Sequence, residues 1–195
     1  MKKYILNIAA LLLLSIGAKA QFALGLKAGF NTSKINTSDV GQTAIGGYQF
    51  GAWTRLGGSL YLQPEMYVSS KGGQLDFPTN STVEGGYAKT RFTTLDVPVL
   101  LGKSFGAKSF NFHIVAGFIY SYILNTDQSY SDNLSNAYKD LGSYKNSSLG
   151  YQVGAGIDLG SISIDGRYEG GLTQINEKYG QRQNLWDISF GFRIL

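Results

Sequence analysis

Apolar and polar residues alternate along almost the whole chain from residue 22 onward, and this period of two constrains the fold more than any other feature of the sequence. Successive side chains of a β-strand point to opposite faces, so each alternating run predicts a strand with one apolar and one polar face. Eight such runs occur, at 22–31, 43–55, 59–71, 89–103, 110–124, 151–159, 162–169 and 186–194. We therefore predict an all-β fold, an eight-stranded antiparallel up-and-down barrel over residues 21–195.

Alternation alone leaves two kinds of barrel open. A soluble lipocalin-like carrier would turn its apolar faces inward around a ligand and leave its polar faces in water. A transmembrane barrel would do the reverse, with apolar side chains toward lipid and a polar lumen. After residue 20 no apolar run reaches 18 residues, so we expect no membrane-spanning helix.

The lengths of the connections favour the transmembrane barrel. Three connections are short, at 56–58, 106–108 and 160–161, and four are long and polar, at 34–42, 72–87, 126–147 and 174–184. All short turns fall at one end of the predicted barrel, together with both chain ends, and all long loops fall at the other. Short turns inside and long loops outside are typical of outer-membrane barrels. We therefore expect a transmembrane β-barrel in the cell outer membrane.

Charged residues gather on the polar faces of the predicted strands, where cations and anions nearly balance and can neutralise one another in a closed lumen. The predicted polar network of the lumen, with a structural role, comprises Lys27, Arg55, Glu65, Asp96, Asp158, Asp165, Arg167, Glu169, Asp187 and Arg193. Lys71 lies on the same faces. Side chains just fill the lumen of an eight-stranded barrel, so a wide pore is not expected.

Two prolines, Pro64 and Pro98, fall inside predicted strands. A proline has no N–H to donate to the sheet, and inside a closed sheet it is usually confined to a bulge. We therefore predict a β-bulge at each of them.

Residues 1–20 have the features of a cleaved secretory signal peptide. Lys2 and Lys3 precede a short apolar stretch, and Ala18 and Ala20 occupy the small-residue positions before Gln21. Removal would leave 14 basic and 13 acidic residues, so we expect no nucleic-acid partner. The expected partners are periplasmic chaperones and the barrel-assembly machinery during biogenesis, and outer-membrane lipid afterwards.

Several short motifs together carry a family resemblance. They are residues 26–31 (LKAGFN), 63–67 (QPEMY), 70–73 (SKGG), 95–101 (LDVPVLL) and 154–158 (GAGID), the last leading to Arg167 and Tyr168. This ensemble resembles the PorT-like outer-membrane β-barrel family of small Bacteroidota barrels. The resemblance implies that the two strand prolines are built-in features, and it implies a possible link to a protein secretion apparatus. It brings no catalytic residues to carry over.

The sequence contains no motif that predicts catalysis or cofactor binding. His113 is the only histidine, and the position two residues later, where lipid A deacylase barrels have serine, is Val115. The glycine-rich run 154–160 leads into another alternating segment, whereas a dinucleotide-binding turn needs a helix there. The absence of cysteine excludes disulfides and thiolate zinc sites. We expect no catalytic, cofactor-binding or metal-binding residues, and no enzyme.

We therefore expect a non-enzymatic outer-membrane protein with a structural or interaction role, long extracellular loops and a side-chain-filled lumen. The loop at 126–147 is rich in Ser, Asn, Asp and Tyr and could bind an extracellular protein or glycan, with Tyr130, Tyr138 and Tyr144 as contact residues. The alternatives are a small-solute channel, an accessory component of a protein secretion apparatus and the soluble lipocalin-like carrier.

Overall fold

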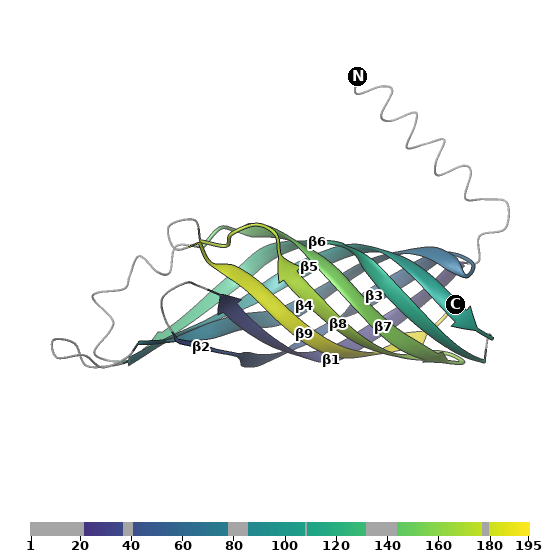
Figure 1. Ribbon diagram of the computed structural model, residues 1–195, viewed down its shortest axis with the longest axis horizontal. Helices are drawn as coiled ribbons and strands as arrows, with labels where there is room; N and C mark the ends of the chain where they lie inside the picture. The colour runs from purple at the N-terminus through teal and green to yellow at the C-terminus, as the bar shows by residue number, and fades with distance from the viewer. Residues whose placement is uncertain (1–21, 37–40, 78–85, 108, 132–143, 177–179) are drawn as a thin grey trace, which may run out of the picture.

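The computed structural model describes residues 22–36, 41–77, 86–107, 109–131, 144–176 and 180–195 (Figure 1). The predicted signal peptide, 1–20, lies outside the described residues. The strands are β1 (Phe22–Asn36), β2 (Gly41–Thr43), β3 (Ile45–Gly57), β4 (Leu60–Phe77), β5 (Gly86–Gly106), β6 (Phe110–Tyr130), β7 (Ser147–Leu159), β8 (Ile162–Gly171) and β9 (Arg182–Arg193). The part of the chain described contains no helix long and apolar enough to cross a membrane.

Eight of the nine strands close into a barrel. Their hydrogen-bonded order is β4-β3-β1-β9-β8-β7-β6-β5, and β5 pairs back with β4. All pairings are antiparallel, and the seam between β1 and β9 runs from Gly25 opposite Arg193 to Asn36 opposite Arg182. The predicted eight-stranded up-and-down barrel is confirmed. The ninth strand, β2, is a short addition that pairs with the outer part of β4.

The apolar faces of the strands point outward and the polar faces point inward. Phe30, Phe118 and Trp186 expose 73%, 63% and 66% of their surface, whereas Lys71 and Arg167 expose 1% and 2%. Apolar side chains can cover the outside of a barrel when that outside faces lipid. This orientation contradicts the lipocalin-like alternative, which needs its apolar faces inside.

The two ends of the barrel differ. One end, the turn end, carries the connections β3 to β4, β5 to β6 and β7 to β8 and the carboxyl terminus, which lies at the right in Figure 1. Gly57, Gly106 and Gly160 stand in these turns with φ values of +135°, +119° and +62°, a backbone region that L-residues with a Cβ rarely adopt. The other end, the loop end, carries the long connections.

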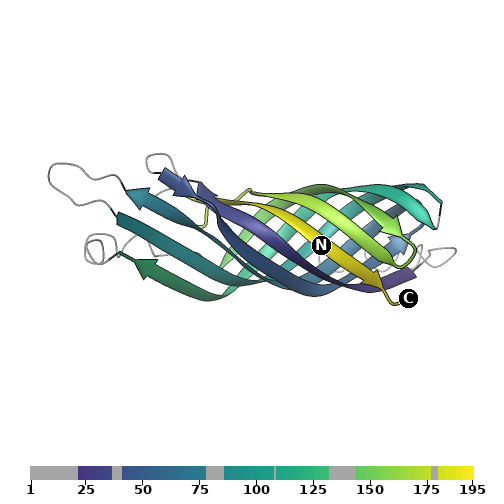
Figure 2. The same ribbon diagram turned by 90° about the horizontal axis from the view of Figure 1, so that it is seen from below.

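Strands β4, β5 and β6 continue beyond the rim at the loop end, as the left sides of Figures 1 and 2 show. They contain 18, 21 and 21 residues, compared with 10 in β8 and 12 in β9. Their outer parts pair with each other, with Phe77 opposite Gly86 and Ala88 opposite Tyr130. We call residues 72–77, 86–91 and 126–130 the projection.

The projection corrects several predicted boundaries. The sequence pattern ended the strands of this region at residues 71 and 124 and began one at residue 89, so that the predicted loops 72–87 and 126–147 include strand residues at their ends. The β4 part of the projection begins with Gly72 and Gly73, which have no side chains that could alternate, and the buried positions of the projection include polar Thr90 besides Leu75 and Ala88. Backbone pairing therefore extends further than the pattern indicates.

The bulges predicted at Pro64 and Pro98 are not found in the described strands. The pairing of β3 with β4 is interrupted around Pro64, but the register is the same on both sides of the gap. Pro98 remains paired with Ile119 of β6. A proline breaks one hydrogen bond without inserting an extra residue, which is the simpler solution. The shift in register between β5 and β6 lies between Thr93 and Thr94 instead.

Candidate functional site: the polar lumen and its two ends

Most of the predicted polar network lies inside the barrel. The buried members are Lys27, Glu65, Asp96, Asp158, Asp165, Arg167, Glu169 and Asp187, and Arg55 is half-buried. Arg193 lies exposed at the turn end, where its guanidinium donates to the carbonyl of Gly160 at 2.7 Å. It stands at the last position of β9, so its side chain extends along the rim.

Two ion pairs cross the lumen between strands on opposite sides of the ring. Strands β4 and β8 are four positions apart in the ring of eight. Lys71 of β4 reaches Glu169 of β8 with 2.9 Å between Nζ and Oε1, and Arg167 of β8 reaches Glu65 of β4 with 2.9 Å between Nη1 and Oε1. The second oxygen of Glu65 accepts from Lys27 Nζ at 2.9 Å. These contacts bridge the full width of the barrel.

A third pair crosses the lumen nearer the turn end, between β3 and β7, which also face each other. Arg55 Nη1 lies 2.7 Å from Asp158 Oδ2. The same carboxylate oxygen lies 3.4 Å from Nδ1 of His113, whose Nε2 lies 2.9 Å from Asp165 Oδ1. Asp165 also accepts from Arg167 at 3.2 Å. The charged groups thus form one continuous chain from the turn end into the middle of the barrel.

Lys71 was not included in the predicted network, yet it occupies a central place. Besides its pair across the lumen, its Nζ lies 3.1 Å from Asp96 Oδ1 and 3.1 Å from Ser121 Oγ. The other oxygen of Asp96 accepts from Ser69 at 2.5 Å and from Thr94 at 3.0 Å. The sequence did contain a signal for Lys71: it lies on the polar face of β4, the face that carries the charged residues of the predicted network.

The charges inside do not balance completely. The interior cations are Lys27, Arg55, Lys71 and Arg167, and the interior carboxylates are Glu65, Asp96, Asp158, Asp165, Glu169 and Asp187. His113 has a carboxylate near each ring nitrogen, and only the contact between Nε2 and Asp165 is a hydrogen bond. Asp187 accepts from Gln49 at 2.9 Å and forms no ion pair within 4 Å with a described residue.

Two glycines of β7 make room for these side chains. A Cβ placed on Gly156 would lie 2.6 Å from His113 Nε2, and one on Gly154 would lie 2.6 Å from Arg167 Cγ. Both glycines belong to the run 154–160, which the structure places within strand β7 and the turn that follows it. The run therefore gives space to charged groups in a narrow lumen.

An apolar cluster lies at the loop end of the lumen. Ile35, Phe92 and Ile175 are each at least 98% buried, and Ile123 and Tyr144 pack against them. The Phe92 and Tyr144 rings meet edge to face with 4.8 Å between their centroids. The sequence pattern missed this cluster because its members come from three distant segments.

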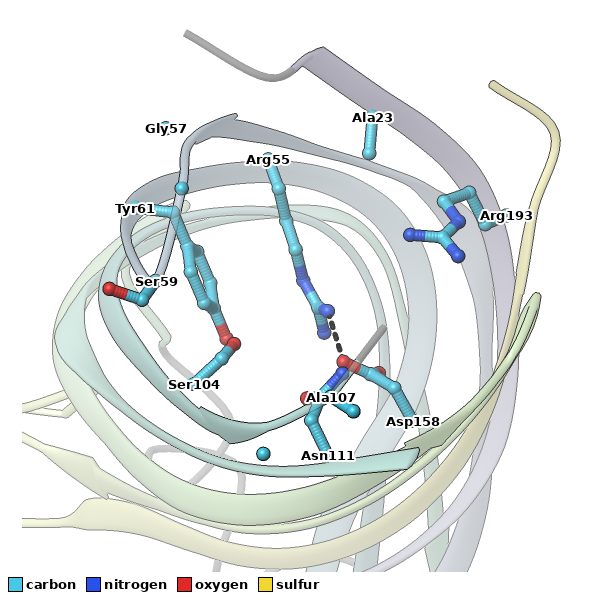
Figure 3. Close-up of a pocket in the computed structure, with 12 residues that line it drawn as sticks. Ala23, Arg55, Gly57, Ser59, Tyr61, Ser104, Ala107, Asn111, Asp158 and Arg193 are labelled. Atoms are coloured by element: carbon cyan, nitrogen blue, oxygen red, sulfur yellow. Dashed lines mark hydrogen bonds and ion pairs between the residues drawn. The ribbon is translucent and has the colours of Figure 1, made fainter. Parts of the chain in front are cut away.

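A small pocket opens at the turn end, with a volume of about 200 Å³. Figure 3 shows Arg55 and Tyr61 pointing into the ring, Asp158 across from them and Arg193 at the edge. The guanidinium of Arg55 lies 4.9 Å from the ring centroids of both Trp53 and Tyr61, at cation–π distance. The ion pair between Arg55 and Asp158 forms the inner end of the pocket.

The chemistry that these groups can perform is limited. Both nitrogens of His113 face carboxylates, and no hydroxyl of a described residue is hydrogen-bonded to them. No group of three or more His, Cys, Asp or Glu side chains in the described ranges could hold a metal ion. The network therefore has the arrangement of a packed, mutually neutralising interior.

Outside the barrel wall, one side-chain hydrogen bond joins the projection to β2, and a second lies within the β4 part of the projection. Thr43 Oγ1 donates to Asp76 Oδ2 at 2.5 Å and Gln74 Nε2 donates to Asp76 Oδ1 at 2.7 Å. These two bonds hold the pKa of Asp76 below its ordinary value. Arg91 donates to the carbonyl of Gly46 at 3.1 Å and links β5 to β3.

Solved structures of small outer-membrane proteins resemble this barrel. OprG from Pseudomonas aeruginosa is 17% identical, with 92% of this chain and 98% of that chain covered and a TM-score of 0.52. Ail of Yersinia pestis, in complex with the heparin analogue sucrose octasulfate, is 10% identical, with 89% of this chain and 99% of that chain covered and a TM-score of 0.50. At these identities the likeness shows the fold alone.

The family assignment rests on a match over most of the sequence. No curated protein matches the chain significantly. The family model described as "Outer membrane protein beta-barrel domain" matches residues 15–177. The chain therefore belongs to the family of outer-membrane protein β-barrel domains, and its place is the outer membrane.

Proposed function

We propose that this protein is a non-enzymatic structural and interaction protein of the outer membrane, with a lumen sealed by its own side chains. The observation that carries the proposal is the set of three ion pairs that cross the lumen between opposite strands. Breaking a buried ion pair leaves an unpaired charge and costs about 3–5 kcal/mol, so such a plug does not open readily. The apolar cluster at the loop end adds a second barrier.

Conductance in planar bilayers tests the sealed lumen. The full chain should show no steady ohmic conductance, because Arg167 and Glu65 block its width. The double variant Arg167→Ala with Glu65→Ala should stay closed, because the other two crossing pairs and the apolar cluster remain. Conductance should appear only when all three crossing pairs are removed together with Phe92→Ala. A control that replaces exposed Arg193 with Gln should behave like the unmodified protein. Steady conductance of the unmodified chain would favour the alternative, a small-solute channel.

The interaction role is assigned to the loop end, where the projection extends outward. Tyr87 exposes 44% of its surface there, whereas Tyr144 packs on Phe92 and Tyr130 is half-buried with its hydroxyl donating to Gln128 at 2.5 Å. The loop tip that contains Tyr138 lies outside the described residues. Of Tyr87, Tyr130 and Tyr144, Tyr87 is the most available to an extracellular protein or glycan.

Cysteine labelling tests which end faces the medium, because the chain has no cysteine of its own. Tyr87→Cys should react with a membrane-impermeant maleimide on intact cells. Lys103→Cys, at the turn end, should react only after the outer membrane is permeabilised. The reverse pattern would refute the proposed orientation.

The non-enzymatic role rests on the surroundings of His113, which is engaged by two aspartates. Incubation of the purified barrel with lipid A and phospholipids should release no acyl chains. Release that is lost in His113→Gln would overturn this part of the proposal.

A second candidate is an accessory role in protein secretion, which the resemblance of the motifs to PorT-like barrels favours. Deletion of the coding sequence would then reduce the amount of secreted cargo in the medium. Unchanged secretion with an altered cell envelope would favour the structural role.

A further inference from the structure

A hollow on the outer surface of the barrel lies at the loop end, over β7, β8, β9 and the end of β1. Its volume is about 420 Å³, within the range of about 300–1,000 Å³ typical of sites for small molecules. Tyr151 and Tyr168 supply aromatic surface, and Arg182, Asn36 and Asn184 supply polar groups. The hollow faces away from the lumen and shares no residue with the pocket at the turn end.

The hollow lies at the level where the lipid-facing surface becomes polar. On β9 the outward residues are apolar as far as Trp186, and Asn184 and Arg182 follow. The segment from Trp186 to Ile194 rises about 26 Å along the strand, or about 20 Å across the membrane for a strand tilted by about 40°. The ring centroids of Tyr168 and Trp186 are 4.9 Å apart, as in an interfacial aromatic girdle.

The hollow lies on the side of the barrel where the strands are shortest and the wall extends least far at the loop end. Strands β8 and β9 have 10 and 12 residues, and the projection is formed by other strands, β4 to β6. Lipid headgroups of the outer leaflet can therefore reach the hollow from the side. The location favours a membrane lipid over a soluble ligand.

One lining residue of the hollow, Arg182, is cationic, and a second cation, Lys34, lies beside the hollow on β1. Arg182 lies opposite Asn36 on β1, and Lys34 lies opposite Asn184 on the same outward face. Within the described ranges neither cation forms an ion pair. Asn36 Oδ1 is buried without a hydrogen-bond partner, and Asn184 Oδ1 accepts from the N–H of Gly171 at 3.3 Å, which leaves its amide N–H groups to donate.

From this combination we infer that the hollow binds the phosphorylated sugar headgroup of an outer-leaflet glycolipid. The guanidinium of Arg182 matches a phosphate group with two parallel hydrogen bonds. The amides of Asn36 and Asn184 pair with sugar hydroxyls, and Tyr151 and Tyr168 cover the apolar faces of the ring. Arg182 and Lys34 form no ion pair with a carboxylate of the described residues, and two such cations disfavour the ammonium group of a zwitterionic headgroup. The inference depends on the outer-membrane location and is independent of the sealed lumen.

Native mass spectrometry of the full chain in detergent tests the inference with defined probes. These are diphosphorylated lipid A, lipid A without phosphate and phosphatidylcholine, each added at the same ratio to protein. Diphosphorylated lipid A should be retained in preference to both others. Arg182→Gln should lower its affinity about tenfold, because the variant loses the charge-assisted hydrogen bonds to the phosphate group. The affinity of Arg182→Lys for diphosphorylated lipid A should lie between that of the unmodified chain and that of Arg182→Gln.

The matched control is Lys103→Gln, which removes an outward cation at the opposite end of the barrel and should leave binding unchanged. Heat-modifiable gel mobility identifies folded barrels, so that a variant that fails to fold is not scored as one that fails to bind. Equal retention of all three lipids, or retention insensitive to Arg182→Gln, would overturn the inference. Displacement by inorganic phosphate at millimolar concentration would also overturn it, since the site would then hold a free anion.

Discussion

Replacement of Lys71 by methionine tests the polar interior most directly. Methionine has a similar length, so the lumen stays filled, but the one cation that pairs with both Asp96 and Glu169 is lost. Lys71 exposes 1% of its side chain, and Asp96 and Glu169 expose 1% and 8%. The variant therefore leaves two carboxylates facing each other with little access to water.

The magnitude follows from the contact distances. The carboxylate oxygens that contact Lys71 Nζ lie at 3.1 and 2.9 Å from it, so they are within about 6 Å of each other. Two unit charges at about 6 Å repel by about 3 kcal/mol at an effective dielectric constant of about 20. Removal of one partner from a buried ion pair costs about 3–5 kcal/mol in other proteins, which is a similar amount. We therefore expect Lys71→Met to lower the free energy of unfolding by about 3–4 kcal/mol.

The assay is urea unfolding of the refolded full chain in lipid vesicles, followed by tryptophan fluorescence. The matched control is the triple variant Lys71→Met with Asp96→Asn and Glu169→Gln, which removes the repulsion and should recover at least about 2 kcal/mol of the loss. A loss below about 1 kcal/mol in Lys71→Met, or no recovery in the triple variant, would refute the account of the interior as a set of mutually neutralising charges.

Three further predictions concern other parts of the molecule. Gly156→Val places methyl groups against the ring of His113, and overpacking should lower the free energy of unfolding by about 1–3 kcal/mol. Because the pKa of Asp76 is lowered in the folded state, its contribution to the pairing of β2 with β4 is complete above the ordinary value of 3.8 and is lost as the pH falls below it. The protection factors of the β2 amides, which are exchange rates corrected for the intrinsic effect of pH, should therefore fall in that range. Arg193→Gln should change the free energy of unfolding by less than about 0.5 kcal/mol, whereas Arg55→Gln should cost several times more, because only Arg55 pairs across the lumen.

Each of these three predictions would be contradicted by a specific result. Unchanged unfolding of Gly156→Val would mean that β7 and β6 can move apart. Protection factors of the β2 amides that stay constant between pH 2 and 5, as expected for the control Asp76→Asn, would show that this carboxylate does not hold the strand. Equal effects of the two arginine variants would contradict the placement of Arg193 outside the lumen.

The strands that cross the membrane were predictable because each of them separates two media of opposite polarity. Trp186 and Ile188 face outward on β9, while Asp187 and Ser189 face the lumen. This contrast appears in the sequence as alternation of apolar and polar residues. The inward direction of the polar faces was predictable too, since all long connections fall at one end. The faces of the charged residues therefore followed from their positions in the alternation.

The pairing of the charges was not predictable in the same way. Lys71 and Glu169 are 98 residues apart, and they meet because the register of the intervening strands brings them to the same depth on opposite walls. Alternation assigns a face but no depth, so it could not distinguish Arg193 at the rim from Arg167 in the centre. The projection was not predicted for another reason: glycines and polar residues such as Gly72, Gly73 and Asp127 interrupt the apolar alternation there, although the backbone pairing continues.

The seam between β1 and β9 joins the two ends of the chain through twelve residue pairs. Until Arg182–Arg193 is in place, β1 and β8 each present an unpaired edge, and such edges recruit other chains. The ring therefore completes only after the last strand has been exported, and its closing contact has nearly the largest sequence separation that the chain allows, which makes closure slow. Loss of the last fourteen residues would therefore remove the closure itself, leaving an open and aggregation-prone sheet in place of a slightly smaller barrel.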